Sequence, residues 1–396
     1  MVSSGGSRLL YTIIWISFLS IMAPAFTGAL RPLFIVEVGA DLVQLALIMA
    51  LPSFVSLLTR VPASALSGRV GRWRMMVISL VISALTTVAF AFVRDPVWFY
   101  PVVAIAALSW AIFSPITVEF VSSRAKAETR GSMMGFYFTS IAAPMFLGPF
   151  LSSFFTLYLD LRTLFLVSAI FPIVALGAFL LMVKPNDMAI SGPRDEGEAE
   201  RPAFWRSIVR ILRVRNFAVL CISRVSFAMS MGIFNTAYSV FAESTLGLTP
   251  SLISLLFTSR GVTNVLTRMP AGRLSDRIGR RKPFIAAYLL VIVSFVLLSY
   301  FRRFEILLVA LALYGVGWGV RIAPSMALAI ESVSDEDRPI ALAVFMTMFD
   351  VGNIIGSLAT GFTSSFLPTN VLMLICAPIM LVAVVIFTVF SKEVEH

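Results

Sequence analysis

The stretch that decides the fold is RMPAGRLSDRIGRRK, residues 268–282, which lies between two long apolar runs. It holds six basic residues and one acid, Asp276, in a short segment marked by two glycines. Lys and Arg are strongly retained on the cytoplasmic face of a membrane, so a loop of this composition indicates the side on which it lies. The stretch therefore predicts a cytoplasmic loop of a protein that crosses a membrane.

A related stretch lies 208 positions earlier in the chain. Residues 60–74 read RVPASALSGRVGRWR and agree with residues 268–282 at eight positions. The same offset relates Arg130 to Arg338 and Gly148 to Gly356. A parallel repeat of six-helix halves is one of the known transporter architectures. This internal repeat therefore predicts that the chain is built from two copies of one design.

The composition excludes an ordinary soluble protein. The 396 residues are 59% hydrophobic and only 13% charged, with a mean hydropathy of +0.94, whereas soluble domains are about 25% charged. The net charge of +10 is compatible with nucleic-acid binding. Almost all of the charges fall in short loops between apolar segments, however, which favours a membrane orientation signal. We therefore predict a polytopic membrane protein.

Apolar runs of about 20 residues, each long enough to span a bilayer as a helix, recur along the whole chain. They predict twelve helices, at residues 9–30, 42–66, 75–93, 97–121, 132–157, 161–183, 216–242, 250–272, 283–300, 305–330, 339–366 and 370–390. The loops on one side carry most of the Lys and Arg. This asymmetry places both termini in the cytoplasm, and we expect the protein in the cell membrane.

The segment between the sixth and seventh predicted helices divides the chain. We predict an N-terminal six-helix bundle at 1–183, a cytoplasmic linker at 184–215 and a C-terminal six-helix bundle at 216–396. The end of the linker has apolar residues at helical spacing, namely Phe204, Ile208, Ile211 and Leu212. Its arginines fall on other faces, which predicts an amphipathic helix on the lipid surface. A solvated linker is the alternative.

The quoted stretch resembles the loop signature of the major facilitator superfamily, G-x-x-x-D-R-x-G-R-R-K. The matching residues are Gly272, Asp276, Arg277, Gly279, Arg280, Arg281 and Lys282. With twelve predicted helices, a central linker and the repeat, the resemblance covers the whole chain. It implies an all-α membrane protein with two six-helix bundles related by pseudo-twofold symmetry. It also implies a secondary transporter that works by alternating access, without a cofactor, and we expect a monomer.

The resemblance further implies a contact, which we call the latch, between this loop and the other half. In relatives the acid of the loop contacts the N-terminus of a helix, where the helix dipole favours negative charge. Here Asp276 would contact the start of the fifth helix near Arg130, supported by Gly272, Arg277, Gly279 and Arg280. In the first-half copy Gly68 stands where the acid should be. The latch is therefore expected on one side only.

Four charged residues lie deep within predicted helices of the second half. They are Arg224, Arg260, Arg321 and Asp350, and the repeat positions in the first half are Ile16, Pro52, Phe113 and Ala142. Polar residues share their helix faces: Asn235, Tyr238, Asn264 and Asn353. A charge in the middle of a bilayer costs about 3 kcal/mol on insertion scales, so such residues mark functional cavities. We predict that these eight residues line the substrate cavity.

The balance of these charges suggests the nature of the ligand. Three arginines against one carboxylate leave a surplus of positive charge, which predicts that the cavity binds an acidic group. The alternative is that Asp350 only neutralises an arginine and holds the half together. Arg60, Arg268 and Glu119 lie close to helix ends, where long side chains reach the interface.

Two transport functions compete on these residues. Proton-coupled export would use Asp350 as the proton carrier, with Glu119 as a second candidate. Uptake or facilitated movement of an anionic metabolite would use the arginines without a proton carrier. The residues around Asp350 resemble efflux members of the family, which favours a small organic solute moved outward. The shortened glycine motif at Gly148 and Pro149 weakens the antiporter interpretation.

Other classes of function receive less support. The one histidine, His396, is the last residue, and Cys221 and Cys376 lie apart in apolar segments. These counts predict no metal site and no catalytic constellation, so we expect no enzyme. No G-x-x-x-x-G-K-[ST] phosphate loop occurs, so we expect no ATP site. A non-transporting membrane sensor or binding protein stays open as the alternative from another class.

Overall fold

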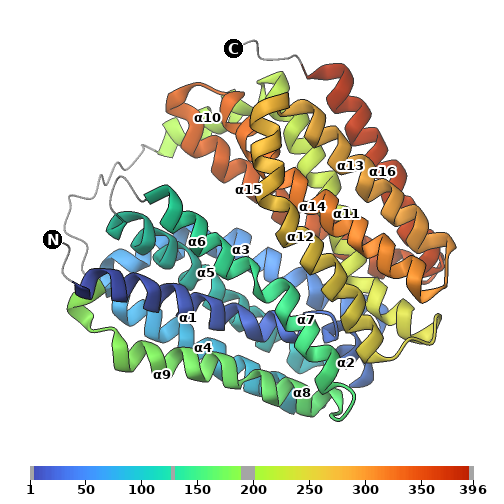
Figure 1. Ribbon diagram of the computed structural model, residues 1–396, viewed down its shortest axis with the longest axis horizontal. Coiled ribbons are helices and arrows are strands. Elements are labelled where there is room, and N and C mark those ends of the chain that lie inside the picture. Colours follow the sequence, from blue (N-terminus) through green and yellow to red (C-terminus); the bar gives the residue numbers. More distant parts are fainter. Residues whose placement is uncertain (1–3, 126–129, 189–200, 392–396) are drawn as a thin grey trace. The chain divides into compact units, whose positions relative to one another are not determined.

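The computed structural model describes residues 4–125, 130–188 and 201–391, and all regular structure in these ranges is helical (Figure 1). The helices of the first part are α1 (Ser4–Gly28), α2 (Arg31–Glu37), α3 (Leu42–Val70), α4 (Arg72–Phe92), α5 (Phe99–Arg124), α6 (Arg130–Ala142), α7 (Pro144–Phe155), α8 (Leu161–Ser168) and α9 (Ile170–Met182). Those of the second part are α10 (Arg201–Leu212), α11 (Arg215–Ser244), α12 (Pro250–Ile278), α13 (Arg281–Tyr300), α14 (Phe304–Glu331), α15 (Arg338–Thr363) and α16 (Thr369–Phe390).

The predicted all-α membrane fold is confirmed. Eleven segments of the described chain are long and apolar enough to cross a membrane. The helix α12 is continuous but too polar to meet that criterion, because Arg260, Asn264 and Arg268 lie along it. Counted with α12, the described chain has the twelve predicted spans.

Two predicted helices are broken rather than continuous. The fifth span consists of α6 and α7, which meet at Ala143, and the sixth consists of α8 and α9, which meet at Ala169. A proline follows each break, Pro144 in one case and Pro172 in the other. Proline lacks the amide hydrogen that a helix needs, and its ring clashes with the carbonyl four residues earlier. The breaks are therefore local effects of proline.

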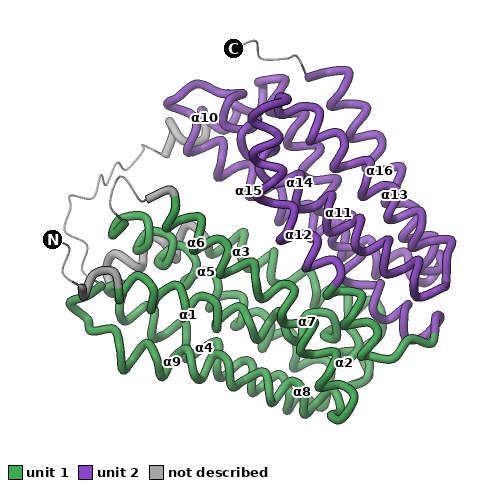
Figure 2. The backbone as a smooth tube through the Cα atoms, viewed as in Figure 1, with its two compact units in different colours: residues 1–192, 247–258 green, residues 193–246, 259–396 purple. Residues whose placement is uncertain are grey.

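The chain forms two compact units, coloured separately in Figure 2. Unit 1 comprises residues 1–192 and 247–258, and unit 2 comprises residues 193–246 and 259–396. The first turns of α12 thus belong to unit 1, although they follow the linker in sequence. The division into bundles at 1–183 and 216–396 stays a prediction.

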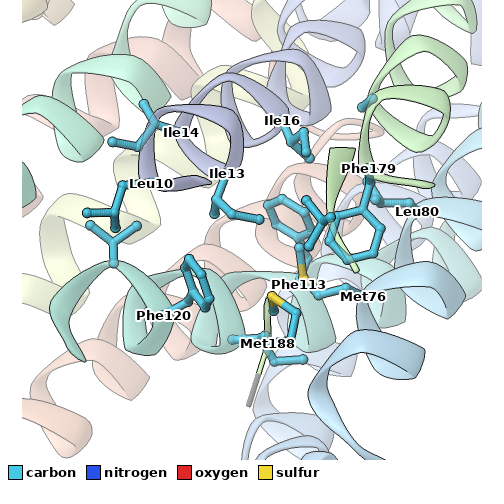
Figure 3. Close-up of a cluster of buried hydrophobic side chains, with 14 of the residues drawn as sticks. Leu10, Ile13, Ile14, Ile16, Met76, Leu80, Phe113, Phe120, Phe179 and Met188 are labelled. Atoms are coloured by element: carbon cyan, nitrogen blue, oxygen red, sulfur yellow. The ribbon is translucent and has the colours of Figure 1, made fainter. Parts of the chain in front are cut away.

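A large apolar cluster forms part of the core of unit 1 (Figure 3). Side chains from α1, α4, α5 and α9 form one buried cluster, to which Met188 also belongs. Ile16 of α1 and Phe113 of α5 both lie in it, exposed by 1% and 2%. These residues are the repeat counterparts of Arg224 and Arg321. At these two positions, unit 1 has ordinary apolar core where the second half has deep charges.

Unit 2 is held together by close helix approaches at glycines. Gly352 and Gly356 of α15 lie against the backbone of Val225 and Met229 in α11, where an added Cβ would clash with backbone atoms. Gly315 and Gly319 of α14 approach α12 in the same way. Small residues permit such backbone contact between membrane helices. These four glycines therefore form small packing faces between the helices.

Replacing Gly356 by Ala is expected to destabilise the protein. The new methyl group would meet the backbone of Met229, which cannot move aside as a flexible side chain would. Overpacking of this kind costs about 1–3 kcal/mol, so the apparent unfolding temperature in detergent should fall. The matched control is Gly177→Ala in α9, where no atom lies within 4 Å of the added carbon. Equal unfolding temperatures for the two variants would contradict the close approach of α11 and α15.

Candidate functional site

The structure brings three of the four deep charges together inside unit 2. Arg224 of α11, Arg321 of α14 and Asp350 of α15 are exposed by only 6%, 1% and 7%. Arg224 interacts electrostatically with both Arg321 and Asp350, unfavourably with the first and favourably with the second. We call these three residues the inner cluster. The inner cluster thus holds one buried carboxylate and two buried guanidinium groups, and the carboxylate acts on that of Arg224.

Arg224 is surrounded by side chains of α15. Its guanidinium carbon lies 4.9 Å from the ring centroids of both Phe345 and Phe349, and its Nη2 lies 3.6 Å from the sulfur of Met346. Aromatic faces attract cations, and the attraction grows when water is excluded. Its Nε has no hydrogen-bond partner among the described residues. Contacts with rings and sulfur thus leave one donor of Arg224 unsatisfied.

Arg321 is the most deeply buried charge. Its guanidinium carbon lies 3.8 Å from the centroid of Phe227, and Tyr288 of α13 forms a hydrogen bond with it. The Tyr288 hydroxyl donates to the carbonyl of Ser223, 2.6 Å away. Within the described chain, Nε and Nη1 of Arg321 have no hydrogen-bond partner. A buried donor left unsatisfied costs about 1–3 kcal/mol, more when it is charged, so these donors are suited to hydrogen bonds with an anionic ligand.

Arg260 of α12 forms a second group, which we call the outer cluster. Its guanidinium carbon lies 5.1 Å from the ring of Phe234 and 5.6 Å from those of Tyr314 and Trp318. Its Nη1 donates to Oδ1 of Asn235 at 3.3 Å. Tyr238 is fully buried and stacks on Phe234, with centroids 4.7 Å apart. Of the predicted cavity residues, Asn235 and Tyr238 thus gather around Arg260.

Two further predicted residues have structural contacts. The amide oxygen of Asn264 accepts hydrogen bonds from Nε and Nη2 of Arg268, at 3.0 and 2.7 Å, and its amide nitrogen donates to the carbonyl of Gly315. Asn264 thus connects Arg268 to α14. Asn353 is half-buried one turn after Asp350, with its carbonyl against Gly232. That these residues line a substrate cavity stays a prediction.

Glu119 is exposed and lies outside the buried cluster of unit 1. Its carboxylate accepts from Nε and Nη2 of Arg72 at 3.1 and 2.5 Å, which joins the ends of α4 and α5. A two-pronged pair of this kind fixes the relative geometry of the two side chains. Its geometry suits a surface ion pair better than a proton carrier.

The latch residues are placed only in part. Asp276 and Arg277 lie in the last turn of α12, and Gly279 has φ +83° in the short connection to α13, a conformation that favours glycine. Arg280 forms an ion pair with Glu331 at the end of α14, 2.5 Å apart. Arg130 begins α6, and its side chain lies outside the described residues. The contact between Asp276 and the start of α6 stays a prediction.

Sequence reasoning did not identify the aromatic partners. Phe345 and Phe349 lie four residues apart and therefore share a face of α15 with access to Arg224. Such spacing is common in apolar helices, so it does not single out a site. Tyr288 and Phe227 carry no local signal either, because only the packing of α11, α13 and α14 brings them to Arg321.

Comparisons with known proteins identify the family. Residues 10–227 and 220–396 both match the family described as Major Facilitator Superfamily. The chain is 22% identical over 359 residues to an uncharacterized MFS-type transporter of Methanocaldococcus jannaschii, covering 90% of this chain and 91% of that protein. It is 22% identical over 335 residues to the multi-drug resistance efflux pump PmrA of Streptococcus pneumoniae, covering 83% and 82%.

A solved structure shows the same fold. A bacterial homologue of the human lysosomal transporter Spinster, in an inward-facing and unoccupied conformation, aligns with a TM-score of 0.78 at 13% identity. The alignment covers 98% of this chain and 96% of that one. At this identity the likeness shows the fold alone. Because the family match extends over both halves, the chain belongs to the major facilitator superfamily and is a multi-pass membrane transporter of small molecules.

Proposed function

We propose that the chain is a proton-coupled secondary transporter that exports a small organic solute from the cell by alternating access. The observation that carries the proposal is the inner cluster, a buried carboxylate beside two buried arginines in unit 2. Ionisable residues within membrane spans mark substrate and proton pathways. The excess of Lys and Arg in one set of loops supports a cell-membrane location with both termini in the cytoplasm.

The arginines are proposed to bind an acidic group of the solute. Arg224, Arg260 and Arg321 all pack against aromatic rings, and Arg224 and Arg321 also keep unsatisfied donors within the described chain. An anion would supply both the missing hydrogen bonds and the balancing charge. The rings around Arg260 offer apolar faces to the body of the same solute. The site therefore favours an organic acid with an apolar or aromatic portion.

Asp350 is the proposed proton carrier. It is the deep carboxylate of the inner cluster, and its charge acts directly on Arg224. Protonation would remove its negative charge and change the field that the solute meets. Outward transport is supported by the similarity to the efflux pump of Streptococcus pneumoniae. Exchange requires that solute and proton occupy the site in turn.

Uptake of an anion together with a proton is a second candidate, and the position of Asp350 beside Arg224 favours it. Protonation of Asp350 would make the inner cluster more positive, so an anionic solute would bind better when the proton is present. Favourable coupling of this kind moves both ligands in the same direction. The electrostatics of the cluster and the similarity to an efflux pump thus support opposite directions for an acidic solute.

Flux measurements in proteoliposomes would decide between the two directions. Vesicles containing the purified protein are made acidic on the outside, and acidic and neutral organic solutes are followed across the membrane. Exchange predicts faster release of solute from inside, whereas cotransport predicts faster uptake from outside. Each predicted response, faster release or faster uptake, is the same whichever way the protein is inserted in the vesicle membrane. A flux that does not respond to the gradient for any solute would overturn proton coupling.

A further inference from the structure

Two arginines on the exposed face of α10 and a third immediately after its end lie in register. Arg206, Arg210 and Arg213 recur at positions i, i+4 and i+7 and so share one side of the helix, with Val209 between them. All four side chains are exposed, and together they line an open groove of about 510 Å³. We call this surface the arginine groove. Its charge is suited to an anion, and Val209 adds an apolar element.

The helix is fixed to unit 2 by its opposite side. Ile211 is completely buried, and α10 packs on α11 and α15. Nη2 of Arg210 lies 2.6 Å from Oδ1 of Asp337, which is exposed by only 7% and immediately precedes α15. The buried side of α10 and the ion pair between Arg210 and Asp337 therefore hold the arginine groove in place. The groove is a defined surface of the folded unit.

A second, apolar groove begins where the arginine groove ends. Leu212, the neighbour of Arg213 in the chain, lines a space of about 330 Å³ together with Ala218, Ile222, Val225 and Met348. It follows α11 from residue 218 to residue 226, a rise of about 12 Å at 1.5 Å per residue. Cys221 and Ser226 complete its mainly apolar lining. The two grooves are linked through the neighbouring residues Leu212 and Arg213, one of which lines each groove.

The position of the two grooves relative to the membrane span follows from α11. By length and composition, the candidate membrane span of this helix runs from Arg215 to Ser244. Arg213 precedes this span, whereas residues 218–226 lie inside it. The basic groove therefore lies just outside the candidate span and the apolar groove within its first part, an order that matches the headgroup and acyl chain of a lipid.

We propose that these two grooves bind one anionic phospholipid, with its phosphate on Arg206 and Arg213 and an acyl chain along α11 between residues 218 and 226. Charge complementarity selects the headgroup, because arginines near an anionic membrane surface attract it strongly. The adjoining apolar groove within the candidate span selects a lipid over a soluble phosphate compound. The site is separate from the inner and outer clusters.

The test measures lipid retained by the full-length protein. The purified protein is incubated in detergent with phosphatidylglycerol or phosphatidylcholine of identical acyl chains, and bound lipid is counted by native mass spectrometry. The wild-type protein should retain phosphatidylglycerol preferentially. The double variant Arg206→Gln, Arg213→Gln should bind it about 25-fold more weakly, at about fivefold for each arginine. The matched control Arg303→Gln, an exposed arginine before α14, should bind like the wild type.

Two further measurements separate the grooves and the source of the phosphate. Ala218→Phe, which fills the apolar groove, should weaken retention of both lipids while the preference for phosphatidylglycerol persists. Excess inorganic phosphate should displace little lipid. Equal retention of the two lipids by the wild type, an unchanged double variant, or full displacement by inorganic phosphate would each overturn the proposal.

Discussion

Replacing Asp350 by Asn is expected to abolish the response of transport to a pH gradient while solute exchange in the absence of a gradient continues. A gradient of one pH unit is worth about 1.36 kcal/mol per proton, so the wild-type protein can concentrate its solute up to about tenfold. Asn has nearly the shape of Asp but carries no proton to release. The variant should therefore reach a concentration ratio of one. The measurement is the steady-state ratio in proteoliposomes, with counterflow as the test of a working protein.

Glu119→Gln is the matched control for the proton carrier. It removes the other candidate carboxylate, which is exposed and forms the pair with Arg72 at the ends of α4 and α5. The control variant should keep the gradient response, with at most a small loss of stability because surface pairs contribute about 0–1 kcal/mol. If Asp350→Asn still concentrates solute, or if Glu119→Gln does not, Asp350 is not the carrier.

The membrane spans and the repeat were predictable from sequence because few physical constraints determine them. Backbone amides find no partners in lipid, so an apolar run of about 20 residues must form a helix. The 208-residue offset also carried information about the site. Ile16 and Phe113 share one buried cluster in unit 1, and their counterparts Arg224 and Arg321 interact in unit 2. The repeat thus relates two positions that belong to one buried cluster in unit 1 and interact in unit 2.

The surroundings of the charges were not predictable, because they depend on how several helices pack. Phe345, Phe349 and Phe227 resemble any other phenylalanine of an apolar helix until α11, α14 and α15 are assembled. Asn264 shared a predicted face with Arg260, yet its amide oxygen binds Arg268 instead. A helical face determines which residues can meet, and the neighbouring helices determine which do.

The breaks in the fifth and sixth spans show a similar limit. Hydropathy gives each as one continuous run, because the averaging that detects a span passes over a single proline. Pro144 and Pro172 signal a bend, but Pro115 and Pro324 lie within helices that stay continuous. Whether a proline breaks or only bends a helix depends on what satisfies the freed carbonyl.

Replacing Arg321 by Met is expected to lower affinity for an acidic solute without lowering stability. Hydrogen bonds to charged groups contribute about 1.5–3 kcal/mol, so loss of this guanidinium should weaken binding about 10- to 100-fold. The stability of the folded protein is expected to stay the same or to rise. The like-charge interaction with Arg224 disappears, two unsatisfied buried donors are removed, and Tyr288 keeps its bond to the Ser223 carbonyl. Replacing a whole buried ion pair by apolar residues of similar size is often neutral or stabilising by about 1–4 kcal/mol, because the desolvation penalty of the charges disappears. The same penalty is removed with Arg321, whose contacts in the described chain are with aromatic rings and not with a carboxylate.

This combination separates a binding role for Arg321 from a structural one. If the inner cluster served only to hold unit 2 together, Arg321→Met would lower the apparent unfolding temperature and reduce the flux of acidic and neutral solutes alike. A binding role predicts an unchanged or higher unfolding temperature and a loss confined to acidic solutes. Arg303→Gln serves as the control, because it removes one exposed positive charge from the residue immediately before α14. A buried arginine that lowers the stability of its own protein is explained if a ligand supplies its missing hydrogen bonds and balances its charge.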